Sequence, residues 1–463
     1  MRRILTALAL FAAAVVGMPF VAATGGDDAR VVMISIDGLM PSAYTDPALA
    51  RYTPHLRALA GAGVWADGVV GVLPTVTYPS HTTLITGVEP ARHGIYDNQI
   101  LDPENRSRGA WYWYADAIKV PTLPMAARAR GLRAGAVTWP VTIGMDLDYN
   151  APEFVDPSRH PERIGMLKAL TQPRGLLQAA EAARGTPFGW PQTDRDRTDL
   201  STFILRTYDP HVFLVHLIAL DSAQHEHGPG SANALETLAQ IDGYVGEIVA
   251  ATRTAGRNAT VAVVSDHGFL PLERQLQPNA AFKQAGLLAV DERGGVTSWQ
   301  AWFHSSGGSG YVYVKDDASR ARVATLLADL KRDPANGIRE IWDGAALAAR
   351  GSHPEAAFGL DVVDGFYTGG GHDVLVKAAP NKGGHGFGPE RTALHSSFVM
   401  AGPAVQRRGS IGVIRMTAIA PTLAEILGVR LAPDAAAPLT LKEPPTSARA
   451  SFGAPATPVR TSR

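Results

Sequence analysis

Short apolar runs of strand length alternate along the chain with segments of helical periodicity. Runs rich in β-branched or small apolar residues predict buried strands over residues 31–36, 134–139, 212–220 and 260–265. Apolar residues recur at helical spacing over residues 53–62, 124–130, 167–184, 236–252, 318–331 and 417–427. Strands that alternate with helices favour an α/β fold, with a mostly parallel central sheet and helices on both of its faces.

Composition divides the chain into a leader, a main domain and a tail. Arg2-Arg3, an apolar stretch and the small residues 21–23 predict a signal peptide at 1–23, so we expect a soluble periplasmic or secreted protein. Residues 24–431 form the predicted domain, with a glycine-rich insertion or lid at about 270–375. Residues 432–463 lack periodicity and predict a disordered tail. No later segment approaches the roughly 20 apolar residues of a membrane span.

Charge and cysteine content exclude several classes of function. Lys and Arg together number 43, as do Asp and Glu, so no global field attracts nucleic acid and no nucleic-acid partner is implied. The chain has no cysteine. This excludes disulfides, a cysteine nucleophile and the oxidised-cysteine aldehyde of many sulfatases.

Aspartate and histidine residues stand where the predicted strands end. Asp37 follows the first strand, Asp221 and His225 follow the third, Asp266 and His267 close the fourth, and His385 lies between two glycines. Open α/β sheets place ligand sites just outside the carboxyl ends of their strands. Imidazole and carboxylate are ligands that zinc favours. The pattern therefore predicts a metal site at one edge of the sheet.

A cluster of hydroxyl residues at 75–83 predicts the start of a helix. Pro79 suits a first helical turn and would place Thr77 at the N-terminus, where free N–H groups and the helix dipole favour phosphate. An ordinary capped helix is the alternative at this point. Threonine is a poor nucleophile that needs a base or a metal, and no lysine or arginine lies close by in sequence.

Taken together, these motifs resemble the type I phosphodiesterase and nucleotide pyrophosphatase family of the alkaline phosphatase superfamily. The resemblance extends from about residue 31 to 429 and rests on the segments 36–38, 77–98, 221–229, 265–268 and 384–386. It implies an alkaline-phosphatase-like core. It also implies a small-molecule substrate, a phosphate diester or a nucleotide with a pyrophosphate bond.

The resemblance also implies roles for individual residues. It implies two zinc ions per chain, one held by Asp221, His225 and His385 and the other by Asp37, Asp266, His267 and the Thr77 oxygen. Thr77 would attack phosphorus and form a covalent phospho-threonine intermediate. The Asn98 amide and the Thr77 backbone N–H would bind a non-bridging oxygen. Tyr78 stands where the family often carries an aromatic residue that stacks on a base.

Several features leave alternatives open. Ser80, Gln224 and residues 218–220 depart from the pattern of many family members without changing the implied ligands. Residues 140–146 contain no Lys-x-Arg, which favours a diesterase over a phosphomonoesterase or phosphonate hydrolase on the same scaffold. A non-catalytic, metal-stabilised binding module is the remaining alternative. We expect structural or supporting roles, not ligation, for the remaining nearby histidines, His81, His93, His227 and His372.

Overall fold

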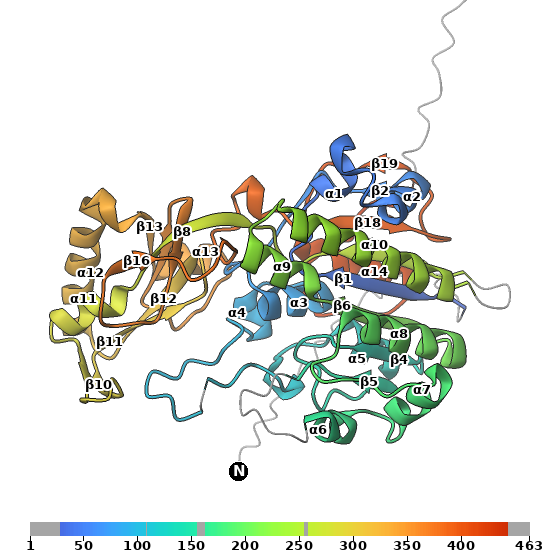
Figure 1. Ribbon diagram of the computed structural model, residues 1–463, viewed down its shortest axis with the longest axis horizontal. Coiled ribbons are helices and arrows are strands. Elements are labelled where there is room, and N and C mark those ends of the chain that lie inside the picture. Colours follow the sequence, from blue (N-terminus) through green and yellow to red (C-terminus); the bar gives the residue numbers. More distant parts are fainter. Residues whose placement is uncertain (1–27, 108, 155–162, 254–257, 443–463) are drawn as a thin grey trace, which may run out of the picture.

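The computed structural model describes residues 28–107, 109–154, 163–253 and 258–442, which contain an eight-stranded central sheet (Figure 1). Its order is β19-β2-β18-β7-β1-β6-β4-β5. The parallel middle comprises β7 (Thr260–Val264), β1 (Val31–Ile36), β6 (Val212–Leu217), β4 (Ala134–Val137) and β5 (Tyr149–Ala151). Beyond β7, β18 (Phe398–Ala401) runs antiparallel between β7 and β2 (Val64–Trp65), and β19 (Gly409–Ser410) is parallel to β2. The predicted mostly parallel α/β sheet is confirmed.

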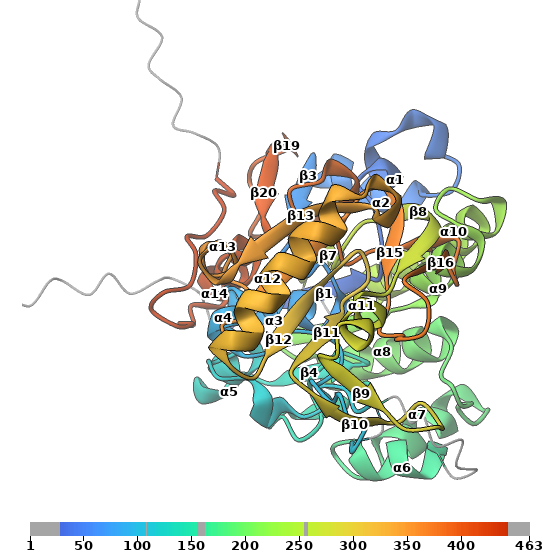
Figure 2. The ribbon, with the colours of Figure 1, turned by 90° about the vertical axis from the view of Figure 1, so that its left-hand side faces the viewer.

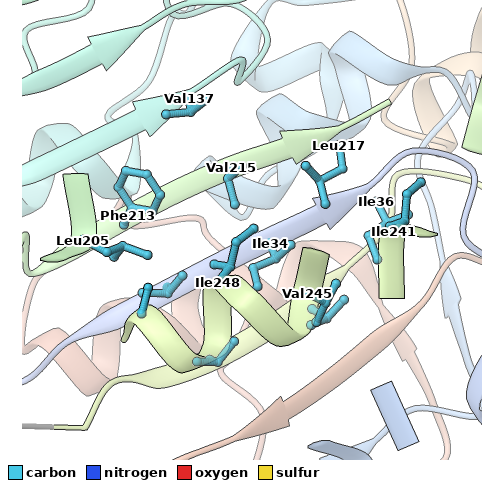
Figure 3. Close-up of a cluster of buried hydrophobic side chains, with 14 of the residues drawn as sticks. Ile34, Ile36, Val137, Leu205, Phe213, Val215, Leu217, Ile241, Val245 and Ile248 are labelled. Atoms are coloured by element: carbon cyan, nitrogen blue, oxygen red, sulfur yellow. The ribbon is translucent and has the colours of Figure 1, made fainter. Parts of the chain in front are cut away.

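Alternate residues of the central strands face two separate hydrophobic cores. Val32, Ile34 and Ile36 of β1 join one core together with α2 (Pro54–Ala62) and α10 (Ala232–Ala251). Figure 3 shows Ile34 and residues of β6 facing the α10 side chains. Val31 and Met33 face the opposite core, which is closed by α3 (Thr77–Thr86), α5 (Leu123–Ala129) and α14 (Ile419–Leu427). Both faces are buried, which explains why the strands read as continuous apolar runs.

Two predicted elements differ from the observed ones. The helix expected over 167–184 is split into α6 (Arg163–Leu170) and α7 (Leu176–Arg184), because Pro173 between them cannot donate a helical hydrogen bond. The strand expected over 212–220 stops at residue 217, and α9 (Ala219–His227) begins two residues later. A further helix, α8 (Asp194–Tyr208), opens with a capping box formed by Thr193 and Asp196.

The insertion has a sheet and a core of its own. Four antiparallel strands, in the order β11 (Ala301–Ser305), β12 (Ser309–Val314), β14 (Phe358–Val362) and β13 (Ile338–Asp343), are covered by α12 (Asp317–Arg332) (Figure 2). Phe282 of α11 (Pro278–Gln284) joins the same core. A second small sheet is built on β8 (Leu270–Leu276), which pairs with β15 (Gly365–Thr368), β16 (Val376–Ala378) and β17 (Gly383–Gly384). The chain returns through β17 directly to His385.

The last described residues pack against the main domain. Leu441 is buried, and its carbonyl accepts hydrogen bonds from the backbone N–H groups of Gln406 and Arg407 at 3.0 and 2.9 Å. The tail boundary predicted at residue 432 is therefore too early, because apolar contacts with Leu439 and Leu441 hold this segment. Residues 443–463 and the predicted signal peptide lie outside the described residues. In the described part of the chain, every helix is too short or too polar to cross a membrane.

Candidate active site

The carboxyl ends of three adjacent central strands converge at one edge of the sheet. Asp37 follows β1, Asp266 and His267 follow β7, and Asp221 lies in the first turn of α9, just after β6. Asp194 of α8 fixes the start of α9 by accepting hydrogen bonds from the backbone N–H groups of residues 218 and 219 at 3.0 and 2.9 Å. His385 reaches the same edge from the end of β17. The structure thus brings together residues that are far apart in sequence.

One group of potential metal ligands comprises Asp37, Asp266 and His267, whose ligand atoms lie within 4.8 Å of one another. The His267 Nε2 atom is 3.4 Å from Asp37 Oδ1 and 3.2 Å from Asp266 Oδ2. The other Asp266 oxygen is fixed by the backbone N–H groups of Gly38 and His267, both at 3.1 Å. All three side chains are buried, and the oxygens that face one another have no hydrogen-bond partner among the described residues.

A second group is centred on one oxygen of Asp221. The Nε2 atoms of His225 and His385 lie 3.4 and 3.6 Å from Asp221 Oδ1. Each ring turns its Nδ1 atom toward a backbone carbonyl, that of Gly383 at 2.8 Å for His225 and that of Thr75 at 3.0 Å for His385. A carbonyl can only accept, so Nδ1 carries the proton and Nε2 offers a lone pair. His267 stacks on His385 at 3.5 Å and lies between the two groups.

The electrostatics of both groups favour a bound cation. Burial, together with the neighbouring carboxylates of Asp266 and Asp221, raises the pKa of Asp37 well above its ordinary value. Burial lowers the pKa of His267 and of His385 to about 3. These two rings are therefore neutral near pH 7, which is the form that binds metal. Burial also acts to lower the pKa of His225, but the hydrogen bond and the charge of Asp221 outweigh it and raise that pKa overall. The buried carboxylates beside the neutral rings of His267 and His385 leave a deficit of positive charge that a divalent ion would supply.

Thr77 is the first residue of α3, as predicted, and its neighbour contacts Asn98. The Tyr78 backbone N–H donates to Asn98 Oδ1 at 2.8 Å, which leaves the Asn98 amide N–H groups to face away from the helix backbone. The first N–H groups of a helix lack partners within the helix. Thr77 lines the same cavity as Asp37 and Asp221. The arrangement places the Thr77 hydroxyl in one cavity with Asp37 and Asp221, and the Asn98 amide against the first turn of the same helix.

The cavity beside Thr77 has a volume of about 630 Å³ and an aromatic wall formed by Trp111, Phe154 and Trp190. Tyr78 is fully buried between Ile95 and Val141, and Trp111 contacts its ring edge-on at 5.2 Å. The Tyr78 ring therefore offers no surface to a substrate in this structure. Trp111, Phe154 and Trp190 are instead the aromatic residues that line the cavity.

The remaining histidines that were expected not to be ligands have other partners. His81 bonds the Thr77 carbonyl through Nδ1 and the Ser35 hydroxyl through Nε2, both at 2.8 Å, and so supports the start of α3. His93 lies 3.1 Å from the Thr83 hydroxyl in the core. His372 contacts the carbonyl of Gly294 at 3.1 Å within the insertion, and His227 lies near the surface glutamate Glu226 at 3.8 Å.

Sequence reasoning missed two buried groups next to the site. His216 lies in the middle of β6, and its Nε2 atom is 3.1 Å from Asp37 Oδ2. Its Nδ1 atom is 4.0 Å from Glu153, a cavity residue whose pKa is raised to about 8 by burial. A histidine inside an otherwise apolar strand was the available signal.

One departure from the family pattern also has a structural role, because the Gln224 amide donates to the Gly38 carbonyl at 2.9 Å.

Comparison with known sequences gives a consistent set of similarities. Residues 31–350 match the sequence profile of the family described as type I phosphodiesterase / nucleotide pyrophosphatase. Human ectonucleotide pyrophosphatase/phosphodiesterase family member 1 is 25% identical over 225 residues, which are 46% of this chain and 21% of that protein. An uncharacterized pyrophosphatase/phosphodiesterase of Schizosaccharomyces pombe is 24% identical over 274 residues, which are 56% of this chain and 48% of that protein. These matches span less than half of each relative's own length.

Solved structures share the fold over most of the chain. Human ectonucleotide pyrophosphatase/phosphodiesterase 5 superposes with a TM-score of 0.62 at 18% identity, covering 87% of this chain and 96% of that one. The mouse protein of the same name, as an inactive threonine-to-alanine variant in complex with AMP, gives a TM-score of 0.62 at 18% identity over 88% of this chain and 96% of that one. The alkaline-phosphatase-like fold that the sequence implied is thereby supported independently.

Proposed function

The chain belongs to the type I phosphodiesterase / nucleotide pyrophosphatase family, and we propose that it hydrolyses phosphate diesters or nucleotide pyrophosphate bonds with Thr77 as the nucleophile. The observation that carries the proposal is the position of Thr77 at the N-terminus of α3, in one cavity with Asp37 and Asp221. The mouse relative whose threonine-to-alanine variant is described as inactive supports a threonine-dependent reaction.

The donor set fits two zinc ions. Asp221, His225 and His385 would hold one ion. Asp37, Asp266, His267 and the Thr77 oxygen would hold the other. Buried carboxylate oxygens and neutral imidazoles without other partners are typical of zinc sites. When bound, zinc supplies Lewis acidity that lowers the pKa of a hydroxyl and neutralises charge on a leaving oxygen.

The residues of the chain divide the reaction among them. The Thr77 hydroxyl loses its proton to solvent and its Oγ atom attacks phosphorus, while the bond from phosphorus to the leaving oxygen breaks and that oxygen gains a proton. Water then attacks the phosphorus of the phospho-threonine, which restores Thr77 and releases the second product. The Asn98 amide and the Thr77 backbone N–H donate to a non-bridging oxygen as its charge grows. His81 holds the Thr77 carbonyl and so fixes the turn that presents the hydroxyl.

The cavity favours a diester over a monoester. A space of about 630 Å³ with an aromatic wall accommodates an organic group next to the phosphorus. Two arginines, Arg163 and Arg197, also line the cavity. Arg197 donates to Asp194 at 2.6 Å, so its charge is already balanced by a carboxylate, and Arg163 also has an interaction partner. Additional uncompensated cations would be expected around a dianionic monoester. The small-molecule substrate we propose therefore carries an ester group on each side of the phosphorus, or a pyrophosphate bond.

A substrate panel on zinc-loaded protein tests this proposal. We expect the p-nitrophenyl ester of thymidine 5′-monophosphate to be cleaved at least tenfold faster than p-nitrophenyl phosphate, and Thr77→Ala to lose turnover while it keeps both metals. Thr86→Ala is the matched control, because Thr86 lies at the other end of α3 and donates to the Thr82 carbonyl. Faster cleavage of the monoester would favour the phosphomonoesterase. If folded, zinc-loaded protein cleaves neither ester, the chain is a metal-stabilised binding module.

We also propose that the protein is exported, with removal of residues 1–23. The support is the sequence pattern of the leader and a chain that has no cysteine to be oxidised outside the cell. N-terminal sequencing of protein from the periplasm or the medium tests this. A mature chain that begins after Ala23 is expected, and one that retains Met1 would contradict it.

A further inference from the structure

A hairpin turn of the insertion packs against the backbone of the proposed active site at His385. Residues 306–308 join β11 to β12, and the turn is closed by the Ser306 N–H, which donates to the Ser309 carbonyl at 2.9 Å. On one side, the Gly308 N–H donates to the His385 carbonyl at 2.7 Å. The approach is close: a Cβ atom on Gly386 would lie 1.7 Å from the Ser306 carbonyl oxygen. The turn therefore packs directly against the backbone of a potential metal ligand.

The other side of the same turn reaches Asn98 through one carboxylate. The Ser306 hydroxyl donates to Asp97 Oδ2, and Asp97 Oδ1 accepts from the Asn98 backbone N–H at 2.7 Å. Asp97 and Ser306 are both buried, with 7% and 4% of their surface exposed. Asn98 Oδ1 in turn accepts from the Tyr78 N–H. Hydrogen bonds thus run without a break from the insertion through Asp97 and Asn98 to the first turn of α3.

We propose that Asp97 and Ser306 are positioning residues that fix the Asn98 amide for the phosphorus oxygen, and that the insertion thereby supports catalysis directly. The proposal rests on the function proposed above. An amide stabilises developing charge only if it is already aimed at the place where the charge appears. Asn98 is half-buried on a loop, so its orientation depends on groups that hold its backbone and its side chain. The Asp97 carboxylate holds the Asn98 backbone, and the Tyr78 N–H holds the Asn98 side chain.

A double-mutant cycle tests whether Asp97 acts through Asn98. We expect Asn98→Ala to lower kcat about 10²–10³-fold, as for other oxyanion donors. Asp97→Ala should lower kcat at least tenfold with KM within about threefold, and Asp97→Asn, which keeps an oxygen acceptor, should recover most of the rate. Coupled residues are non-additive, so the double variant should lie within about threefold of Asn98→Ala alone. If the two losses multiply, Asp97 acts independently of Asn98 and the proposal is wrong.

Amide hydrogen exchange gives a readout that does not depend on turnover. Ser306→Ala should speed exchange of the amides at residues 97–99, although these residues are distant in sequence. Thr325→Ala is the control from the same insertion, because its hydroxyl donates to the Ala321 carbonyl at 3.2 Å within α12 and does not contact the turn. Unchanged exchange in Ser306→Ala, in an enzyme that still cleaves diesters, would overturn the positioning role alone. If Ser306→Ala speeds exchange at residues 97–99 but the wild-type protein cleaves no ester, the positioning contact stands and the proposed function is overturned.

Discussion

Replacing His216 by phenylalanine should weaken one of the two proposed zinc sites and spare the other. The His216 Nε2 atom is 3.1 Å from Asp37 Oδ2, whereas the other Asp37 oxygen faces His267 at 3.4 Å. Phenylalanine keeps a ring in the place that packs against His81 at 4.2 Å but has no nitrogen atom to form a hydrogen bond with Asp37. Asp37 would then lose the group that fixes its orientation and would keep a buried oxygen without a partner.

The size of the effect follows from the supporting role of His216. Removing a partner of a metal ligand typically weakens metal binding by about 10–100-fold. This corresponds to about 1.4–2.7 kcal/mol of binding free energy. The loss should fall on the site of Asp37, Asp266 and His267, since the rings of His225 and His385 are oriented by backbone carbonyls that the substitution leaves in place.

A competition titration of the purified protein with a colorimetric zinc chelator measures both ions. We expect one ion to be released at about 10–100-fold lower chelator concentration than in the wild type. The chelator concentration that releases the other ion should change by less than about twofold. His93→Phe is the matched control, because His93 is equally buried but contacts Thr83 and Ile95 in place of a ligand. Wild-type affinity at both sites in His216→Phe, or the same weakening in His93→Phe, would refute the reasoning.

Three further outcomes are expected. Chelation should lower the unfolding temperature reversibly, because zinc at about 100 times its Kd adds about 2.7 kcal/mol to the stability of the folded state; equal thermal melts with and without chelator would contradict this. Burial lowers the pKa of His93 to about 3, below the value of about 6.5 in unfolded chains. The neutral His93 therefore contributes fully to the free energy of unfolding above about pH 6.5, and this contribution is lost as the pH falls toward 3. In denaturant titrations His93→Phe should remove about 1.4 kcal/mol per pH unit of acid destabilisation, and parallel pH profiles of the two proteins would exclude this role of His93. Trp111→Ala should raise KM for a nucleotide diester about tenfold with kcat nearly unchanged, by loss of stacking, and steady-state kinetics with an unaltered KM would remove Trp111 from the substrate wall.

The sequence predicted the central sheet well because its strands are buried on both faces. Runs such as residues 31–36 and 260–265 stay apolar without interruption, and the polar residue that follows each run marks the sheet edge. The same rule predicted that Asp37, Asp266 and His267 lie close together. The strand predicted for β6 was too long, because Ala219 and Leu220 continue the apolar run although they already belong to α9. Local composition does not distinguish a strand end from a helix start when both are apolar.

Residues that depend on three-dimensional partners were beyond sequence reasoning. His216 and Asp97 support the site only because β6 lies beside β1 and the turn of the insertion folds back to residue 97. The prediction that Tyr78 contacts the substrate came from the family resemblance, because Tyr78 stands where the family often carries an aromatic residue that stacks on a base. However, α3 is buried on all sides, so no amphipathic pattern separates a ring that faces the cavity from one that faces the core. Trp111 faces the cavity from a loop far from Thr77 in sequence, and only the fold places it there.

The covalent step is the central claim, and trapping the intermediate tests it most directly. Zinc-loaded protein would be mixed with the p-nitrophenyl ester of thymidine 5′-monophosphate, quenched in acid during turnover, digested and analysed by mass spectrometry. We expect the thymidine monophosphoryl group on the peptide that contains Thr77, at Thr77 itself, and no adduct in Thr77→Ala. An adduct on another residue, or turnover by Thr77→Ala at a rate near that of the wild type, would contradict the account.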